Sequence, residues 1–522
     1  MESDPPSAPT HHTLHNTSSQ ESHDVEKAGR TRSNMLHSGD DQDHDETATA
    51  VHEKLDPAEM NPVAVSPGAA TNKPRRFAHG FFDPELAGMR KASIKIMVMY
   101  TILIILAMWS TLIAFWGSFY HAADRSNRLS IAVFDFDTPS SLGASTGLAT
   151  DVPTLGQYIV QACLANANGS TTDGHTRGTL GFWEADASKH PDMASIENAI
   201  VQEEFWAAVV IPRQTTSNLL QARQNGDTAW QPQDTVLYVY NQARNENAAG
   251  SYIVPIGQAV LTRATAAWAA RSAGRYLSTI AGNQTAIQAL VAAPQTISPG
   301  VSFRLNNLRS FAVAPTATAA TLVGGIFTIV FAFLLTMAFS AVRGIIGPFL
   351  TLKQYIAMRL VIPTICYVFV SLSIAMLNLP YKVPFDAHFS YGTGFFVWWM
   401  ACLCAVTCGL ALEFWMTILG PRFTAFAMLF IIIYQVSTVS LPHELQISFF
   451  HYGIGVPLNR TANILRTLIF DTKSELGLGF GVLLAWWALS AFITLPLITW
   501  VYRRKELKAH RKEQEGASSP AA

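Results

Sequence analysis

Two charged residues stand directly after long uncharged stretches, where their chemistry would depend on a poorly hydrated surrounding. Glu413 follows the run 389–412, and Arg343 follows the run 311–342. An ionisable side chain at membrane depth is costly and often binds substrate or couples transport to an ion. Glu413 would stand near the end of its run, where it could also reach water. We predict Glu413 and Arg343 as substrate or coupling candidates, with anchoring at the membrane interface as the alternative.

A second set of candidates lies in the loop 442–475. Its apolar residues recur at helical spacing, which predicts an amphipathic helix at the outer membrane interface. The pattern is carried by Ile464, Leu465, Leu468 and Ile469. We predict Pro457, Arg460 and Arg466 as residues of an outer gate, and a purely structural hairpin remains the alternative.

Catalytic and metal-binding patterns are weak in this sequence. It holds no Gly-Lys-Ser or Gly-Lys-Thr of a P-loop and no His-Glu-x-x-His. Asp135 and Asp137 are predicted as solvated acids at the end of a strand, and the cysteines of the run 389–412 as apolar filling rather than a metal cluster. Cys163 has no partner in the polar middle region for a disulfide. We therefore expect no enzyme, catalytic residue, metal or cofactor.

The composition is that of a membrane protein. The chain of 522 residues is 49% hydrophobic and only 14% charged, whereas soluble proteins carry about a quarter charged residues. A net charge of -1 gives no basic surplus for nucleic acid. Uncharged runs long enough to cross a bilayer as helices are 96–120, 311–342, 360–381, 389–412, 423–441 and 476–502. The predicted fold is a polytopic α-helical membrane protein with six transmembrane helices, one followed by five.

Lysine and arginine flanks orient these spans. They gather before the first span and after the last, and also between the second and third, which predicts cytoplasmic N- and C-termini. The predicted domains are a disordered cytoplasmic tail (1–75), a juxtamembrane segment with the first span (76–120), an extracytoplasmic domain (121–310), a five-helix domain (311–502) and a basic tail (503–522). Asn168, Asn283 and Asn459 head sequons on the predicted outside and are glycosylation candidates.

The region 121–310 alternates between two kinds of pattern. The segments 129–137, 206–212 and 235–241 are rich in β-branched and aromatic residues, which predicts strands. Helical spacing follows in 193–205 and 215–223, and a long helix leading to the second span is predicted over 250–291. These patterns indicate a mixed α/β domain.

Several stretches resemble known membrane protein families. IAVFDFD (131–137), EEFWAAVVIP (203–212) and PLNRTANILRTLIF (457–470) are similar to segments of ATP-binding-cassette exporter permeases and of the bacterial phage-infection-protein group. VYNQARNENAAGSYIVP (239–255), GLALEFWMTILGPRF (409–423) and the block 451–486 resemble the fungal nitrosoguanidine-resistance membrane proteins, over roughly residues 85–505.

That resemblance implies a plasma-membrane export permease that confers resistance to toxic small molecules. The alternative is a membrane factor that acts in lipid homeostasis or as a scaffold without transport. The expected partners are membrane lipids and small amphipathic or toxic molecules, with a homodimer implied by analogy to exporters and no nucleic acid.

Overall fold

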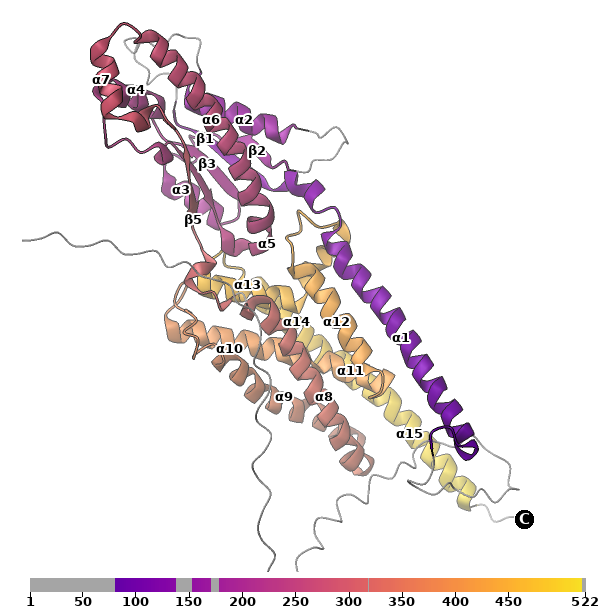
Figure 1. Cartoon of the computed structure of the whole chain (residues 1–522). Coiled ribbons are helices and arrows are strands. Elements are labelled where there is room, and N and C mark those ends of the chain that lie inside the picture. The colour runs from indigo at the N-terminus through magenta and orange to yellow at the C-terminus, as the bar shows by residue number, and fades with distance from the viewer. Residues whose placement is uncertain (1–79, 138–152, 170–177, 318, 519–522) are drawn as a thin grey trace, which may run out of the picture. The chain divides into compact units, whose positions relative to one another are not determined.

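The computed structural model describes residues 80–137, 153–169, 178–317 and 319–518 (Figure 1). The predicted tail 1–75 lies outside the described residues, as do the last four residues of the predicted basic tail. Helices dominate, and one five-stranded sheet lies between the first long helix and the remaining ones along the chain.

The sheet has the strand order β2-β1-β3-β4-β5. Its central strands are β1 (Ser130–Asp135), β3 (Ala207–Ile211) and β4 (Val236–Tyr240), and its edges are β2 (Gly181–Glu184) and β5 (Phe303–Asn307). β1 pairs in parallel with both β2 and β3, β3 pairs antiparallel with β4, and β4 pairs in parallel with β5. The three strands predicted from the sequence are confirmed as the three central ones.

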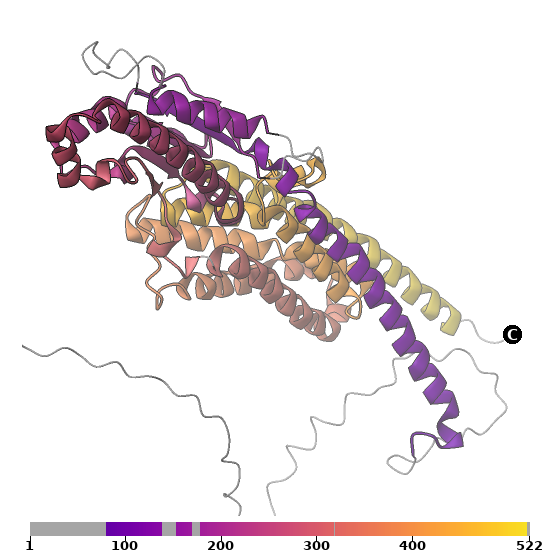
Figure 2. The same cartoon turned by 45° about the horizontal axis from the view of Figure 1, so that its top comes forward.

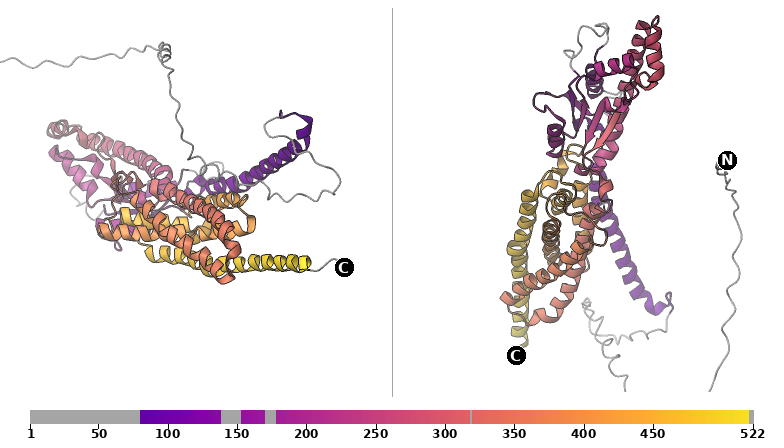
Figure 3. Two further views of the ribbon diagram at one scale, coloured as in Figure 1. Left: turned by 90° about the horizontal axis from the view of Figure 1, so that it is seen from below. Right: turned by 90° about the vertical axis from the view of Figure 1, so that its left-hand side faces the viewer.

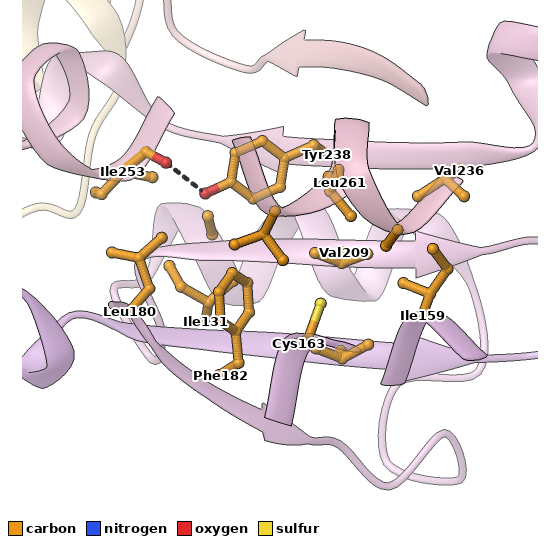
Figure 4. Packing of buried hydrophobic residues seen from close by; sticks show 14 of the residues in the cluster. Ile131, Ile159, Cys163, Leu180, Phe182, Val209, Val236, Tyr238, Ile253 and Leu261 are labelled. Carbon is orange, nitrogen blue, oxygen red and sulfur yellow. Dashed lines mark hydrogen bonds between the residues drawn. The ribbon is translucent and has the colours of Figure 1, made fainter. Parts of the chain in front are cut away.

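Alternating side chains of the strands build two cores, one on each face of the sheet. Ile131, Val209 and Tyr238 pack on α2 (Leu155–Ala167) and α6 (Val254–Thr279), as Figure 4 shows around Cys163. Phe134, Val210 and their neighbours pack on the opposite face with α3 (Met193–Val201). The Tyr238 hydroxyl donates a hydrogen bond of 2.9 Å to the carbonyl of Ile253, which satisfies its polar end inside the core (Figure 4).

The region predicted as one long helix is two helices, and neither leads to the second span. α6 ends at Thr279, and after the Gly282-Asn283 turn α7 covers Gln284–Ala292. The chain then returns to the sheet as β5. Asn283 caps α7 by accepting hydrogen bonds from the backbone of Thr285 and Ala286, at 3.1 and 3.2 Å. An N-cap asparagine behind a glycine marks a helix start, and it interrupts the apolar pattern.

Within the part of the chain that the structure describes, five helical segments are long and apolar enough to cross a membrane. Their bounds are Pro84–Phe119, Ala319–Phe349, Leu352–Met376, Tyr391–Leu419 and Leu476–Lys512. The fifth predicted span, 423–441, forms α12 (Thr424–Val439), which is apolar but has only 16 residues. At 1.5 Å per residue it covers about 24 Å, less than the roughly 30 Å of a hydrocarbon core.

These segments are built from several helices. The first is mainly α1 (Ala87–Phe119), the second contains α8 (Gly325–Ile346) and the third is α9 (Leu352–Met376). α10 (Tyr391–Thr407) and α11 (Leu410–Leu419) together form the fourth, and α14 (Leu476–Ala488) continues into α15 (Leu495–Ser518). A π-helical turn, Leu489–Thr494, stands directly before Pro496, where the proline predicts a departure from regular α-helix.

The helices of 319–518 pack around α10 and α13 (Pro457–Phe470). α10 contacts α8, α9, α13 and α14, and α11 contacts α8, α12 and α15 (Figure 2). α15 extends past the ends of α8 to α11 (Figure 3). α13 is buried on nearly every side, although it was predicted as a helix at the membrane surface. Its arginines are enclosed between the α/β domain and the helices, which its amphipathic spacing alone does not reveal.

Candidate functional site

Glu413 lies in a closed cluster of charges between helices. Its carboxylate accepts hydrogen bonds at Oε2 from Arg343 of α8 and from Arg359 of α9, the second at 3.1 Å. Arg359 also donates to the hydroxyls of Thr499 at 2.8 Å and Thr417 at 2.6 Å. The side chain of Glu413 has no exposed surface, and that of Arg359 is 2% exposed. We call Arg343, Arg359 and Glu413 the Glu413 cluster.

The structure brings the two predicted residues together and adds a third. Arg343 is the partner of Glu413, and the expectation that Glu413 could reach water is wrong because the helices enclose it. Arg359 was counted in the sequence only as a cytoplasmic flanking charge, one residue before an apolar run. A basic residue at such a boundary, with an acid at the end of another run, was the available signal for a buried pair. The cluster carries two positive charges against one negative.

An apolar cavity of about 310 Å³ lies among the helices, next to α11 and to the start of α13. Its walls come from α8, the junction of α10 and α11, α12, the start of α13 and Trp486 of α14. Its size falls in the range of about 300 to 1,000 Å³ that small-molecule sites occupy. Pro457, predicted as a gate residue, lines this cavity.

A second cavity, polar and of about 290 Å³, is also lined by residues of α13. Arg460 and Arg466, the two other predicted gate residues, line it together with the neighbouring Asn459 and Asn463. The α/β domain contributes Glu203, Trp206 and Arg244 to the wall, and the loop after α12 contributes His443 and Glu444. The predicted gate residues are thus divided between two cavities instead of forming one cluster.

The charged residues of the polar cavity are paired across elements. Arg460 donates to Glu475 at 2.7 Å, and Arg466 donates to Glu246 at 2.9 Å, so that α13 is tied both to the start of α14 and to the α/β domain. Arg244 lies over the Trp206 ring at 3.6 Å from its centre and 3.5 Å from Glu444. Neither Glu444 nor Glu475 was predicted from the sequence as a site residue.

Amide side chains lie between the residues that line the two cavities, at a place that we call the α12–α13 seam. Gln435 of α12 accepts a hydrogen bond of 3.1 Å from the backbone of Leu458, and Asn459 donates one of 3.1 Å to the carbonyl of Thr438. Gly325 of α8 lies so close to Leu458 that any side chain there would collide with it. The first turn of α13 is therefore held between α8 and α12 by contacts that a small shift of either helix would alter.

Burial shifts the pKa of three groups in the polar cavity. The pKa of Glu203 is raised, chiefly by desolvation and against the opposing charge of Arg244. Desolvation also lowers the pKa of His443, with a contribution from His451, so that neutral imidazole is favoured. The pKa of Arg244 is lowered by the same cause.

The acids and thiols of the α/β domain have structural roles. Asp137 is buried, contrary to the prediction that it is solvated, and accepts hydrogen bonds from the backbone and hydroxyl of Thr216 at 3.1 and 2.5 Å. Burial raises the pKa of Asp137, and it raises that of Cys163 to about 12. Among the described residues, no three His, Cys, Asp or Glu side chains gather as a metal site. The Gly-x-Ser-x-Gly spacing of Gly143–Gly147, typical of a nucleophile elbow, lies outside the described residues.

The three glycosylation candidates differ in access. Asn168 is the exposed C-cap residue of α2, and Asn283 is the exposed N-cap of α7. Asn459 is half-buried in the wall of the polar cavity, with its amide bonded to Thr438.

Comparison with known proteins places the chain among membrane proteins. It is 22% identical over 441 residues to an uncharacterized endoplasmic reticulum membrane protein of Saccharomyces cerevisiae, and the match covers 82% of this chain and 84% of the relative. No solved structure matches. The resemblance to a fungal membrane protein family is thereby supported, without the nitrosoguanidine-resistance name. A family model matches residues 100–492, and the chain therefore belongs to the family described as "Protein of unknown function (DUF3533)".

Proposed function

We propose that this membrane protein is a permease that binds an apolar or amphipathic molecule in the apolar cavity and moves it across the membrane. The observation that carries the proposal is the apolar cavity of about 310 Å³ lined by residues of α8, α10, α11, α12, α13 and α14. Helix-lined cavities at membrane depth are where transporters hold substrate. Resistance to toxic small molecules would follow from export of such compounds.

In this proposal the α/β domain lies on the extracytoplasmic side of the membrane, and both termini of the chain lie in the cytoplasm. Six spans, with α12 extended by its flanking residues, give that arrangement, and the flanking lysines and arginines favour it. The plasma membrane is the proposed location. The yeast relative is described as an endoplasmic reticulum protein. Fluorescence microscopy of a tagged chain distinguishes the two locations.

A non-transporting role in lipid homeostasis is the second candidate. It is favoured by the Glu413 cluster, whose carboxylate is enclosed by two arginines and so is poorly placed to take up and release protons.

We also propose a homodimer, for which α1 offers a largely exposed apolar surface that includes Met97, Trp109 and Trp116.

The test is efflux of a fluorescent amphipathic toxicant from liposomes that contain the purified full chain. Ala405 and Ala411 line the cavity and are half-buried, so Ala405→Phe and Ala411→Phe fill it from two helices. The matched control is Ala425→Phe, because Ala425 is exposed on α12 and outside the cavity wall. We expect both filling variants to abolish efflux and the control to retain it.

Two results would decide against transport. If the wild-type chain gives no efflux above empty liposomes under an imposed proton or sodium gradient, the permease proposal fails. If cells without the protein then show altered lipid distribution between leaflets but normal toxicant accumulation, the lipid-homeostasis candidate takes its place. Efflux that is equal in all variants would show that the cavity is not the route.

A further inference from the structure

We propose that the polar cavity binds the zwitterionic headgroup of a single-chain amphipathic molecule whose tail lies in the apolar cavity. The inference rests on the proposed function for the tail site and names the substrate class. It takes up the polar cavity, which the permease proposal leaves without a role.

The two cavities share three helices as walls. On α12, Gln435 lines the apolar cavity, and Val439, one turn later, lines the polar one. On α13, Leu458 and Asn459 are consecutive residues that line different cavities. On α14, Trp486 lines the apolar cavity and Leu478 the polar one. A molecule with a polar end and an apolar end would meet matching surroundings on the two sides of the α12–α13 seam.

The charges of the polar cavity include both signs in similar number. Its cations are Arg244, Arg460, Arg466 and Lys473, and its acids are Glu203, Glu444 and Glu475. Glu203 and Glu444 share one cation, Arg244, at 3.9 and 3.5 Å, whereas Lys473 has no ion pair to a described residue. One part of the wall therefore has an acid in excess and another part a cation in excess. A headgroup that carries phosphate and ammonium together satisfies both sets, because each of its charges finds an opposite partner.

Unused hydrogen-bonding capacity indicates where the phosphate would bind. Lys473 is the one cavity cation with no ion pair to a described residue. Arg460 and Arg466 are 4% and 6% exposed, and the Nε atom of each has no hydrogen-bond partner among the described residues. Buried donors without partners are costly, and phosphate oxygens would satisfy them.

The experiment measures binding of a fluorescent lysophosphatidylcholine to the full chain in an uncharged maltoside detergent. Competitors are unlabelled lysophosphatidylcholine, a monoacylglycerol with the same acyl chain, and soluble phosphocholine. The headgroup variant is Lys473→Gln, which alters a half-buried side chain and is not expected to affect folding. Its matched control is Lys353→Gln, at an exposed position of α9. Ala405→Phe reports on the tail site.

We expect Lys473→Gln to weaken lysophosphatidylcholine about tenfold, the value of one hydrogen bond to a charged group. It should leave monoacylglycerol binding unchanged, whereas Ala405→Phe should weaken both. Equal wild-type affinity for the two amphipathic molecules, or an unchanged affinity in Lys473→Gln, overturns the headgroup site while the effect of Ala405→Phe keeps the proposed tail site. Competition by phosphocholine alone at similar concentration would show that the ligand is a soluble zwitterion, which overturns the inference. If Ala405→Phe changes neither affinity, the tail site fails together with the proposed function.

Discussion

Around Glu413, two guanidinium groups enclose one carboxylate that has no exposed surface, whereas around Arg460 four cations and three carboxylates line a space of about 290 Å³. Both regions combine arginine with glutamate. In the first, threonine hydroxyls of α11 and α15 accept hydrogen bonds from Arg359, whose Nε has no hydrogen-bond partner among the described residues. In the second, the charges come from the α/β domain and from the helices and leave room between them.

The difference teaches that a buried charge is evidence for function only when something else can reach it. The Glu413 cluster joins α8, α9 and α11, so its simplest role is to fix their packing. The polar cavity has charges that a ligand could contact, and its walls come from the α/β domain and from the helices. The predictions below test this division with matched substitutions.

The largest effect is expected from Glu413→Gln. Removal of the negative charge leaves Arg343 and Arg359 buried without compensation, and loss of one partner of a buried ion pair costs about 3–5 kcal/mol. Thermal unfolding of the purified chain in detergent measures the loss. The double variant Glu413→Gln, Arg359→Gln should recover part of it. If stability is unchanged but efflux is lost, Glu413 acts in coupling, and the Glu413 cluster is not merely structural.

Glu475→Gln is the same substitution in the open region, and a smaller effect is expected. The Glu475 side chain is 31% exposed, and its partner Arg460 faces a cavity that can admit water. The expected loss is smaller than the roughly 3–5 kcal/mol of a fully buried pair, because Glu475 is partly exposed although Arg460 is not. The same unfolding experiment measures it. A loss as large as that of Glu413→Gln would show that the polar cavity is closed and structural.

The sequence was informative where local pattern decides the structure. Runs without charge predicted the apolar long helices, and segments rich in β-branched and aromatic residues predicted the central strands β1, β3 and β4. The edge strands escaped because β5 reads Phe-Arg-Leu-Asn-Asn and β2 has only four residues. Arg359 escaped because its partners lie 54 and 140 residues away, at Glu413 and Thr499. Such contacts depend on helix packing, which a single sequence does not encode locally.

The two cavities were not predicted from the sequence, for the same reason. Pro457, Arg460 and Arg466 were singled out together from one helical segment, yet Pro457 faces one cavity and the arginines the other. The loop was recognisable as informative, but the assignment of its residues required the positions of α12 and of the α/β domain.

A smaller, pH-dependent effect is expected at His443. Its lowered pKa means that the unfolded chain binds a proton more readily, near pH 6.5, than the folded chain does. Stability should therefore fall as the pH falls through about 6.5 and level off below the folded pKa. Glu203, whose pKa is raised, acts with the opposite sign at lower pH, because the folded chain then binds the proton more readily.

His443→Gln should flatten the fall in unfolding midpoint between about pH 7.5 and 6, and His451→Gln should flatten it less. If the fall is unchanged in His443→Gln, this imidazole is accessible to water in the open cavity, and the cavity is more hydrated than its lining indicates.

The smallest effect on stability, and the clearest on topology, is expected from the glycosylation sites. Thr285→Ala destroys the Asn283 sequon but keeps the Asn283 carbonyl that caps α7. It should therefore increase gel mobility through loss of one glycan, with little change in unfolding.

Thr461→Val destroys the Asn459 sequon and should leave the mobility unchanged, because the Asn459 amide is bonded to Thr438 in the cavity wall. A glycan on Asn459 would require the α12–α13 seam to open before folding is complete. No glycan on Asn168 or Asn283 would contradict the extracytoplasmic position of the α/β domain and turn the polar cavity toward the cytoplasm.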